Sequence, residues 1–421
     1  MKSIFWIKSL RNKIIATLAL VLVYKFLSVI PVPWANVAAL EGIMDANKGL
    51  AFFSALMWGG LERFSIILMG LSPYINAVII IQLLGVIVPK IGDMQKEWEA
   101  GQKKINKMTR WLTLPIAFVQ SYGMMILLNT LSASAGGWAI IDMTDLNTVL
   151  MSMVIITAGT IFLMWLWEVM TEYGIGNGIS IIITAWVLAA TPGVIMNYIS
   201  GAQFSLFFWL LLATLAIIYV IIKFTEWNRR IPIIYSRTGR EEKSYFPIKV
   251  NQAGMIPIIF AVSIVTFPTI LGQILSRSSG TAASNVSAFL LQYFDMSNPS
   301  WLLIIVYFSL VLAFSFFYVS ITFNTEQVAE NIQKRGWYIP GIRPWADTAK
   351  HLERVSNRLN LFWWGFLALI AVLPYIIGKL MNQSIDFIIS GAGLIIIVSV
   401  ILDLIRKVDA EVKMFDYSKF K

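Results

Sequence analysis

Ten separate stretches of about 20 mostly apolar residues run through this chain and restrict what it can fold into. About 20 such residues are needed for a helix to cross the hydrocarbon core of a bilayer, where every backbone polar group must be satisfied internally. Charged residues make up only 13% of the chain, against about 25% in soluble domains. We therefore predict an all-α polytopic membrane protein whose ten transmembrane helices lie at residues 14–33, 65–88, 109–130, 147–167, 175–195, 205–224, 252–274, 301–323, 361–381 and 385–406.

Lysine and arginine are distributed unevenly over the segments that join these spans. Cytoplasmic loops carry an excess of both residues. The amino-terminal segment, the loops after the second, sixth and eighth spans, and the carboxyl-terminal segment carry four, six, seven, six and five of them, and the alternate loops at most two. We therefore predict that both termini are cytoplasmic. The loop at residues 168–178 is an exception, because it should be cytoplasmic yet has no basic residue.

Signatures of catalysis and of metal binding are missing from the sequence. It has no cysteine and a single histidine, His351, which excludes a disulfide framework and a multi-histidine metal site. Residues 174–178 have the glycine spacing of a phosphate loop but lack the following lysine, so we interpret them as a tight turn between two spans. Only Lys25 lies deep in a predicted span, which argues against a proton-coupled pump. We expect no enzymatic activity, no metal and no cofactor.

Two kinds of irregular segment interrupt the apolar pattern. Residues 50–58 are apolar but too few to cross a membrane, and Gly59-Gly60 follows them. They fit a re-entrant half-helix, an interfacial helix, a buried pore element or an amphipathic external loop. Residues 70–74 and 253–257 place glycine and proline inside the second and seventh spans, where proline is expected to kink a helix. Such kinks at comparable points of two halves indicate a functional centre, and ordinary tolerance of these residues is the alternative.

Ten spans also divide into five plus five, and an odd number in each half inverts the second half relative to the first. We predict an amino-terminal half at residues 1–201 and a carboxyl-terminal half at residues 202–421, the latter with large cytoplasmic loops at about 225–250 and 324–360. Polar amides inside the spans should face other helices or water, because an unpaired amide in lipid is costly. These are Asn76, Gln82, Gln120 and Asn251.

Four long motifs occur in order along the chain, at residues 70–84, 172–181, 229–257 and 331–344. They resemble, in turn, the second span, the fourth-to-fifth loop, the sixth loop with the seventh span, and the eighth loop of the SecY family. The resemblance implies an hourglass channel in the cell inner (plasma) membrane for unfolded preproteins, with a lateral gate for membrane segments and signal peptides. It implies SecE and SecG as partner subunits, and the SecA ATPase or the ribosome as the partner that drives transport.

The resemblance also implies a pore ring and a plug. A ring of aliphatic side chains closes a pore by excluding water and deforms around any peptide. The ring residues would be Leu71, Ile75, Ile183, Ile259 and Ile396, for each of which lipid contact or core packing is the alternative. Residues 50–64 would form the plug helix, with glycine as its hinge, and its members would be Phe52, Phe53, Leu56, Met57, Gly59, Gly60 and Arg63.

The lateral gate would open between the second and third spans on one side and the seventh and eighth on the other. By resemblance, its lining residues would be Asn76, Gln82, Asn251 and Phe267. Basic loops attract anionic partners, and the contacts with SecA or the ribosome would be Arg229, Arg230 and Arg343.

Two residues depart from the family pattern. Trp345 stands where glycine is usual, and Tyr173 stands where arginine is usual. Both lie on the expected cytoplasmic face and leave open a divergent or accessory member of the family. Two other classes are alternatives: a secondary transporter or lipid flippase with an inverted five-plus-five fold, and a structural assembly subunit. The scarcity of buried carboxylates argues against the first class, and the plug-like segment and kinked spans argue against the second.

Overall fold

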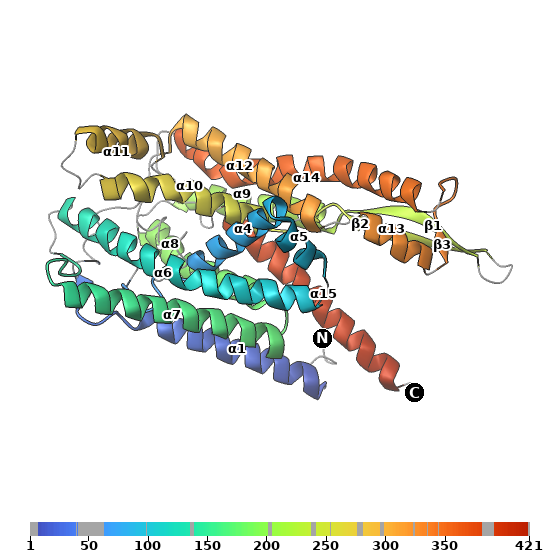
Figure 1. The fold of residues 1–421 in the computed structure, drawn as a ribbon, viewed down its shortest axis with the longest axis horizontal. Helices are drawn as coiled ribbons and strands as arrows, with labels where there is room; N and C mark the ends of the chain where they lie inside the picture. Colours follow the sequence, from blue (N-terminus) through green and yellow to red (C-terminus); the bar gives the residue numbers. More distant parts are fainter. Residues whose placement is uncertain are drawn as a thin grey trace. The chain divides into compact units, whose positions relative to one another are not determined.

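The computed structural model of this chain describes residues 7–38, 40, 63–97, 99–134, 139–200, 204–236, 241–252, 254–275, 281–294, 299–322, 325–334, 336–343, 345–380 and 391–419. These residues are mostly helical, as predicted, and six of the described helices are long and apolar enough to cross a membrane. One helix lies in each of the ten predicted spans (Figure 1): α1 (Lys8–Val29), α4 (Ser72–Ile87), α6 (Glu99–Ser134), α7 (Leu146–Tyr173), α8 (Gly178–Ser200), α9 (Phe204–Glu226), α10 (Ile256–Leu275), α12 (Trp301–Thr322), α14 (Ala346–Leu380) and α15 (Gly391–Lys419). Shorter helices are α5 (Pro89–Lys96), α11 (Thr281–Phe294) and α13 (Thr325–Lys334).

The second and seventh spans begin later than predicted. The helices α4 and α10 begin at Ser72 and Ile256, not at residues 65 and 252. Gly70 and Gly254 have φ angles of 52° and 64°, a left-handed conformation that ends any helix reaching it. The proline that follows each glycine lies in the first helical turn, where its missing N–H breaks no helical hydrogen bond. The prediction that these two prolines kink their spans is therefore wrong, because they start helices instead.

The first span is shifted toward the amino terminus relative to the prediction. Ile30 has an extended backbone and ends α1 at Val29, one residue before Pro31. Lys25 therefore lies four residues from the end of α1 and is exposed, not deep in the span as predicted. Its ammonium group is then close enough to the helix end to reach polar surroundings along its own stem.

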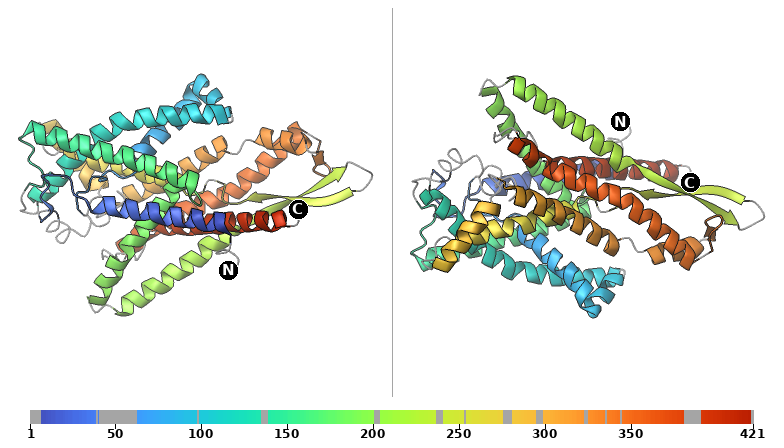
Figure 2. Two further views of the ribbon diagram at one scale, coloured as in Figure 1. Left: turned by 90° about the horizontal axis from the view of Figure 1, so that it is seen from below. Right: turned by 90° about the horizontal axis from the view of Figure 1, so that it is seen from above.

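The two large loops of the carboxyl-terminal half contain a sheet that we did not predict. The strands β1 (Asn228–Ser236) and β2 (Glu241–Lys249) pair antiparallel along their whole length and form a long ribbon (Figure 2). β3 (Trp337–Tyr338) pairs with β1, so the strand order is β2-β1-β3. Alternation explains the pairing, because Ile231 and Ile233 are buried on one face whereas Arg230 and Pro232 are exposed on the other.

Contacts group the chain into two compact units, residues 1–196, 262–303 and 400–421 in unit 1 and residues 197–261 and 304–399 in unit 2. A large apolar core in unit 1 includes Phe64, Met125 and Ile156. In unit 2 a smaller core packs Ile231, Ile233 and Ile248 of the sheet against α13 and the first turns of α14. This grouping does not address internal symmetry, so the boundary between two halves at residue 201 stays a prediction.

Asp145 caps the amino terminus of α7 and gives a testable pH dependence. Its carboxylate accepts hydrogen bonds from the Thr148 hydroxyl at 2.5 Å and from the Asn147 N–H at 3.1 Å. These two bonds lower the pKa of Asp145. Because the pKa is lower in the folded than in the unfolded chain, Asp145 stabilises the fold above the unfolded value of about 3.9, and this contribution is lost as the pH falls through the folded pKa.

We expect Asp145→Asn to lower stability at neutral pH and to remove the acid-dependent step that Asp145 contributes. Asparagine keeps the cap but does not titrate. Thermal unfolding midpoints of the detergent-solubilised wild type and variant, measured from neutral pH down to about pH 2, would converge as the pH falls. A constant difference between the two proteins over this range would show that Asp145 titrates alike in the folded and unfolded states.

Candidate functional site

All five residues predicted to form the pore ring are buried, with exposed fractions between 0% and 7%. This rules out lipid contact for them, since a side chain that faces lipid is exposed in a structure without a bilayer. Leu71, Ile75 and Ile183 belong to unit 1, at the start of α4 and on α8. Ile259 and Ile396 belong to unit 2, on α10 and α15. The meeting of all five in one ring therefore stays a prediction.

The starts of α4 and α10 share a short sequence repeat. Both read glycine-x-x-proline-x-isoleucine, beginning at Gly70 and Gly254, and both glycines have positive φ. Each helix begins two residues after its glycine. Ile75 and Ile259 are the isoleucines of the two copies, so both ring residues lie in the first turns of helices that start in the same way. Hydropathy alone did not reveal this repeat, because both copies lie within longer apolar stretches.

Most of the predicted plug lies outside the described residues: Phe52, Phe53, Leu56, Met57, Gly59 and Gly60. Arg63 is described and exposed, and the next residue, Phe64, is fully buried in the core of unit 1. The carbonyl of Phe64 accepts a hydrogen bond from Val32 N at 2.9 Å, and Ile66 N donates to Ile30 O at 3.0 Å. The carboxyl end of the plug segment is therefore fixed to the chain just beyond α1.

The residues predicted to line the lateral gate lie on α4 and at α10. Gln82 on α4 has a buried side-chain oxygen without a hydrogen-bond partner in the described ranges, and Asn76 is half-buried on the same helix. Asn251 Oδ1 accepts a hydrogen bond from Gly254 N at 2.7 Å, which helps to set the turn before α10. Phe267 on α10 is 57% exposed. These members are divided between the two units, so the gate itself stays a prediction.

The three arginines predicted to contact SecA or the ribosome belong to unit 2. Arg229 and Arg230 are adjacent and exposed on β1, opposite Ile248 and Pro247 of β2. Arg343 is exposed in the segment between β3 and α14, and its carbonyl accepts a hydrogen bond from the Thr348 hydroxyl at 2.9 Å. Within the described part of the chain none of the three arginines has a carboxylate partner. No ion pair among the described residues therefore competes with an anionic partner for these three guanidinium groups.

At Trp345, one of the two departures from the family pattern, the backbone has a conformation that suits glycine better than tryptophan. Its φ angle is 76°, a conformation that costs an L-residue about 1–2 kcal/mol and that glycine adopts freely. We expect Trp345→Gly to raise the free energy of unfolding by about 0.5–1 kcal/mol, after the larger entropy loss of glycine is included. The 61% exposed indole leaves little packing to lose.

Trp345→Ala is the matched control, because alanine removes the indole but keeps the Cβ atom that causes the strain. Chemical denaturation of the purified protein should therefore rank Trp345→Gly above the wild type and Trp345→Ala no higher than the wild type. A glycine variant less stable than the alanine variant would contradict the strain.

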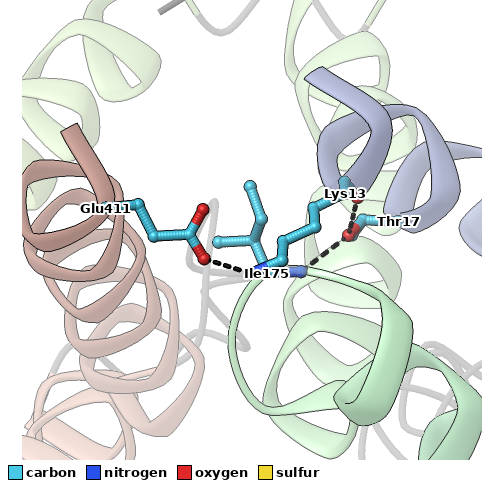
Figure 3. Close-up of polar contacts among 4 residues, drawn as sticks. All are labelled: Lys13, Thr17, Ile175 and Glu411. Carbon is cyan, nitrogen blue, oxygen red and sulfur yellow. Dashed lines mark hydrogen bonds and ion pairs between the residues drawn. The ribbon is translucent and has the colours of Figure 1, made fainter. Parts of the chain in front are cut away.

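The tight turn at residues 174–178 is confirmed, and helices from both ends of the chain hold it (Figure 3). Ile175 N donates a hydrogen bond to Thr17 Oγ1 of α1 at 3.0 Å. Lys13 of α1 forms an ion pair with Glu411 of α15. Gly176 has a φ angle of 101°, which glycine alone adopts without strain. In the sequence, Lys13 is only one of the basic residues that indicate topology, and nothing there marks Thr17 or Glu411 as part of this contact.

A pocket of about 310 Å³ lies beside this turn, with Lys13, Lys407, Glu172 and Glu411 as its charged lining residues. Two lysines and two glutamates leave it without net charge, so its lining favours neither an anion nor a cation. A further ion pair in unit 1 joins Arg110 of α6 to Glu168 of α7 at 2.8 Å. Glu168 therefore has an interhelical partner within unit 1.

The fold and the site place this chain in the class of polytopic helical membrane proteins. Its spans carry buried aliphatic residues near their starts, and a sheet with exposed arginines lies between spans. The SecY family profile matches residues 65–405. The protein translocase subunit SecY of Staphylococcus carnosus (strain TM300) is 34% identical over 432 residues, which cover 99% of this chain and 97% of that protein. The subunit of the same name from Staphylococcus aureus (strain NCTC 8325) is 35% identical over 436 residues with the same coverage. The chain belongs to the SecY family.

Solved structures give the same fold. A protein-conducting channel aligns with a TM-score of 0.66 and 16% identity, over 95% of this chain and 92% of that chain. A SecY from work on the plug domain aligns with a TM-score of 0.68 and 18% identity, with the same coverage. Sec61 from a canine ribosome–channel complex aligns with a TM-score of 0.63 and 16% identity, also with this coverage. The prediction of a polytopic all-α membrane protein is confirmed.

Proposed function

We propose that this chain is the channel subunit of a protein translocase, which conducts unfolded secretory proteins across the membrane and releases membrane segments through a lateral gate. The observation that carries the proposal is the match, along 99% of the chain, to protein translocase subunits. The chain supplies a path and no chemistry of its own. Energy for transport comes from the ATP that SecA hydrolyses, from translation, or from the membrane potential.

The pore ring closes this path in the resting channel. Aliphatic side chains at a constriction exclude water because they offer it no hydrogen bonds, and ions without water do not pass. Their apolar contacts, unlike hydrogen bonds, require no particular geometry, so the ring fits around any peptide sequence. The burial of all five residues and the equivalent positions of Ile75 and Ile259 support this role. The same repeat supports two inverted halves, at residues 1–201 and 202–421.

The plug and the lateral gate act beside the ring. Residues 50–64 seal the closed channel and swing about Gly59-Gly60, while the buried Phe64 keeps their carboxyl end in place. The gate opens along α4 and α10, where Asn76, Gln82, Asn251 and Phe267 line it. The oxygen of Gln82, which has no hydrogen-bond partner among the described residues, favours opening because it gains hydrogen bonds once water or peptide reaches it.

Partners bind on the cytoplasmic side of the inner membrane. Arg229, Arg230 and Arg343 contact SecA or the ribosome, and the exposure of all three supports this role. SecE and SecG complete the complex. Both termini are cytoplasmic, which agrees with the distribution of lysine and arginine and with the ion pair between Lys13 near the first residue and Glu411 near the last.

Reconstitution tests the proposed function. The full chain is placed in liposomes with SecE, SecA and ATP, and protease protection of a secretory precursor is scored. We expect protection that depends on ATP. A complex that binds SecE and still protects no precursor would overturn the proposal and favour an accessory family member with its own motor, or a transporter.

A further inference from the structure

A cluster of three polar side chains, two of them buried, joins the segment before α10 to α14. Gln252, in the segment between β2 and α10, accepts hydrogen bonds at its Oε1 from Ser356 Oγ at 2.9 Å and from Asn360 Nδ2 at 3.1 Å. Asn360 Nδ2 also donates to Ser356 Oγ at 3.0 Å. Ser356 and Asn360 are one helical turn apart on α14 and are 2% and 0% exposed. We call these three residues the amide cluster.

The amide cluster lies next to a glycine in the turn before α10. Gly254 follows Gln252 by two residues and has a φ angle of 64°; apart from its chain neighbours, no atom of the described residues lies within 4 Å of the position that a Cβ would occupy. Glycine there permits the backbone to rotate without strain. Gln252 therefore fixes to α14 the segment on one side of this glycine, and α10 continues on the other side. All of these contacts lie within unit 2.

The cluster is incompletely satisfied. Gln252 Nε2 and Asn360 Oδ1 are buried and have no hydrogen-bond partner in the described residues. A buried donor or acceptor without a partner is destabilising, and it regains its hydrogen bonds when it reaches water. The two hydrogen bonds that Gln252 accepts from α14 therefore favour the state in which α10 is held, whereas the two atoms without a partner among the described residues favour the state in which it is released. This opposition reduces the free-energy difference between the two states.

We propose that the amide cluster positions α10 in the closed channel and that Gln252 leaves Ser356 and Asn360 when the lateral gate opens. This inference rests on the proposed function, because it assigns the cluster to the gating of that channel. The cluster acts through α10 and does not contact the transported peptide, so its residues are positioning residues. Its effect is to set how easily a signal peptide opens the gate.

Gln252→Met tests the inference, because methionine keeps the length of the side chain and removes both polar ends. Ser356 and Asn360 then lack the acceptor that they share in the closed state, so the substitution destabilises the closed state and not the open one. We expect the open probability of reconstituted channels in planar bilayers to rise about tenfold, since a loss of about 1.4 kcal/mol corresponds to that factor. Export of a precursor with a defective signal peptide should rise as well. Ser315→Ala is the control: it removes another buried hydroxyl bond, from Ser315 to Val311 O on α12, without touching the cluster.

The double variant Gln252→Met/Asn360→Leu separates gating from general loss of stability. It replaces the unpartnered polar atoms by apolar groups, which do not gain water on opening. We expect its open probability to fall back to the wild-type level or below, a non-additive result that independent structural damage does not produce.

An unchanged open probability in Gln252→Met would overturn the inference. So would a double variant whose effect equals the product of the effects of Gln252→Met and Asn360→Leu measured separately. A wild-type complex that translocates no precursor would overturn the proposed function instead. The two failures are distinguishable, because the first occurs with an active wild-type channel.

Discussion

Serine at three positions of the pore ring will make the closed channel permeable to ions. In Ile75→Ser/Ile183→Ser/Ile259→Ser the constriction offers hydroxyl groups to water and is no longer closed by dewetting. Burial of one such aliphatic side chain is worth about 1.5 kcal/mol or more, so we expect the ion leak through resting proteoliposomes to rise at least tenfold. The leak is measured as dissipation of an imposed potassium gradient without precursor or motor.

Valine at the same three positions keeps the aliphatic surface, and that variant should remain closed. Ile156→Ser on α7 is a second control, because Ile156 is equally buried in the core of unit 1 and is not a ring residue. A leak in the Ile156 variant as large as in the triple variant would attribute the effect to loss of stability. A triple variant that does not leak ions and still translocates precursor would show that the ring residues do not form the seal.

Arg343→Glu will greatly reduce transport driven by SecA while leaving the channel folded. Reversal of a charge at a partner contact costs about 2–5 kcal/mol, so we expect precursor transport at a fixed SecA concentration to fall about thirtyfold or more. Arg343 has no carboxylate partner among the described residues, so the substitution breaks no ion pair in that part of the chain. Arg343→Lys should be intermediate, because lysine keeps the charge and loses the planar group.

Arg354→Glu is the matched control for this prediction. Arg354 is exposed on α14, in the same loop region, and its substitution changes the net charge by the same amount. Equal losses in both variants would show that the basic loops act through their total charge. Equal transport by Arg343→Glu and the wild type would place the motor elsewhere.

The spans were predictable because hydropathy records what the bilayer requires of each segment. The ten apolar stretches correspond to ten helices of the described chain. Helix starts were less predictable, because glycine can adopt either sign of φ. The surrounding structure, and not the sequence pattern, gives Gly70 and Gly254 their positive φ. Hydropathy windows average over such single residues. Lys25 was misplaced for the same reason, since the extended Ile30 ends α1 early.

The sheet and the polar contacts were not predictable from local pattern. The nine residues of β1 read as a basic loop, and they form a strand only because residues of β2 and β3 pair with them. Lys13 and Glu411 are separated by 398 positions in the sequence, and Gln252 and Asn360 by 108. Contacts of this kind depend on the tertiary fold. The ring residues were found by resemblance, and their burial could not be predicted because most isoleucines here lie in apolar stretches.

The β1–β2 ribbon has a mechanical consequence. Two strands of nine paired residues extend about 30 Å at 3.3 Å per residue. Their hydrogen bonds lie perpendicular to the strands. A force that slides one strand past the other along the ribbon would therefore load many bonds at once, whereas a force that pulls the two strands apart at one end would break them one by one. The ribbon is thus stiff along its axis and continues through Asn251 into the turn before α10. If a bound motor pushed or tilted the β1–β2 ribbon, the ribbon would transmit that force to α10 as a torque.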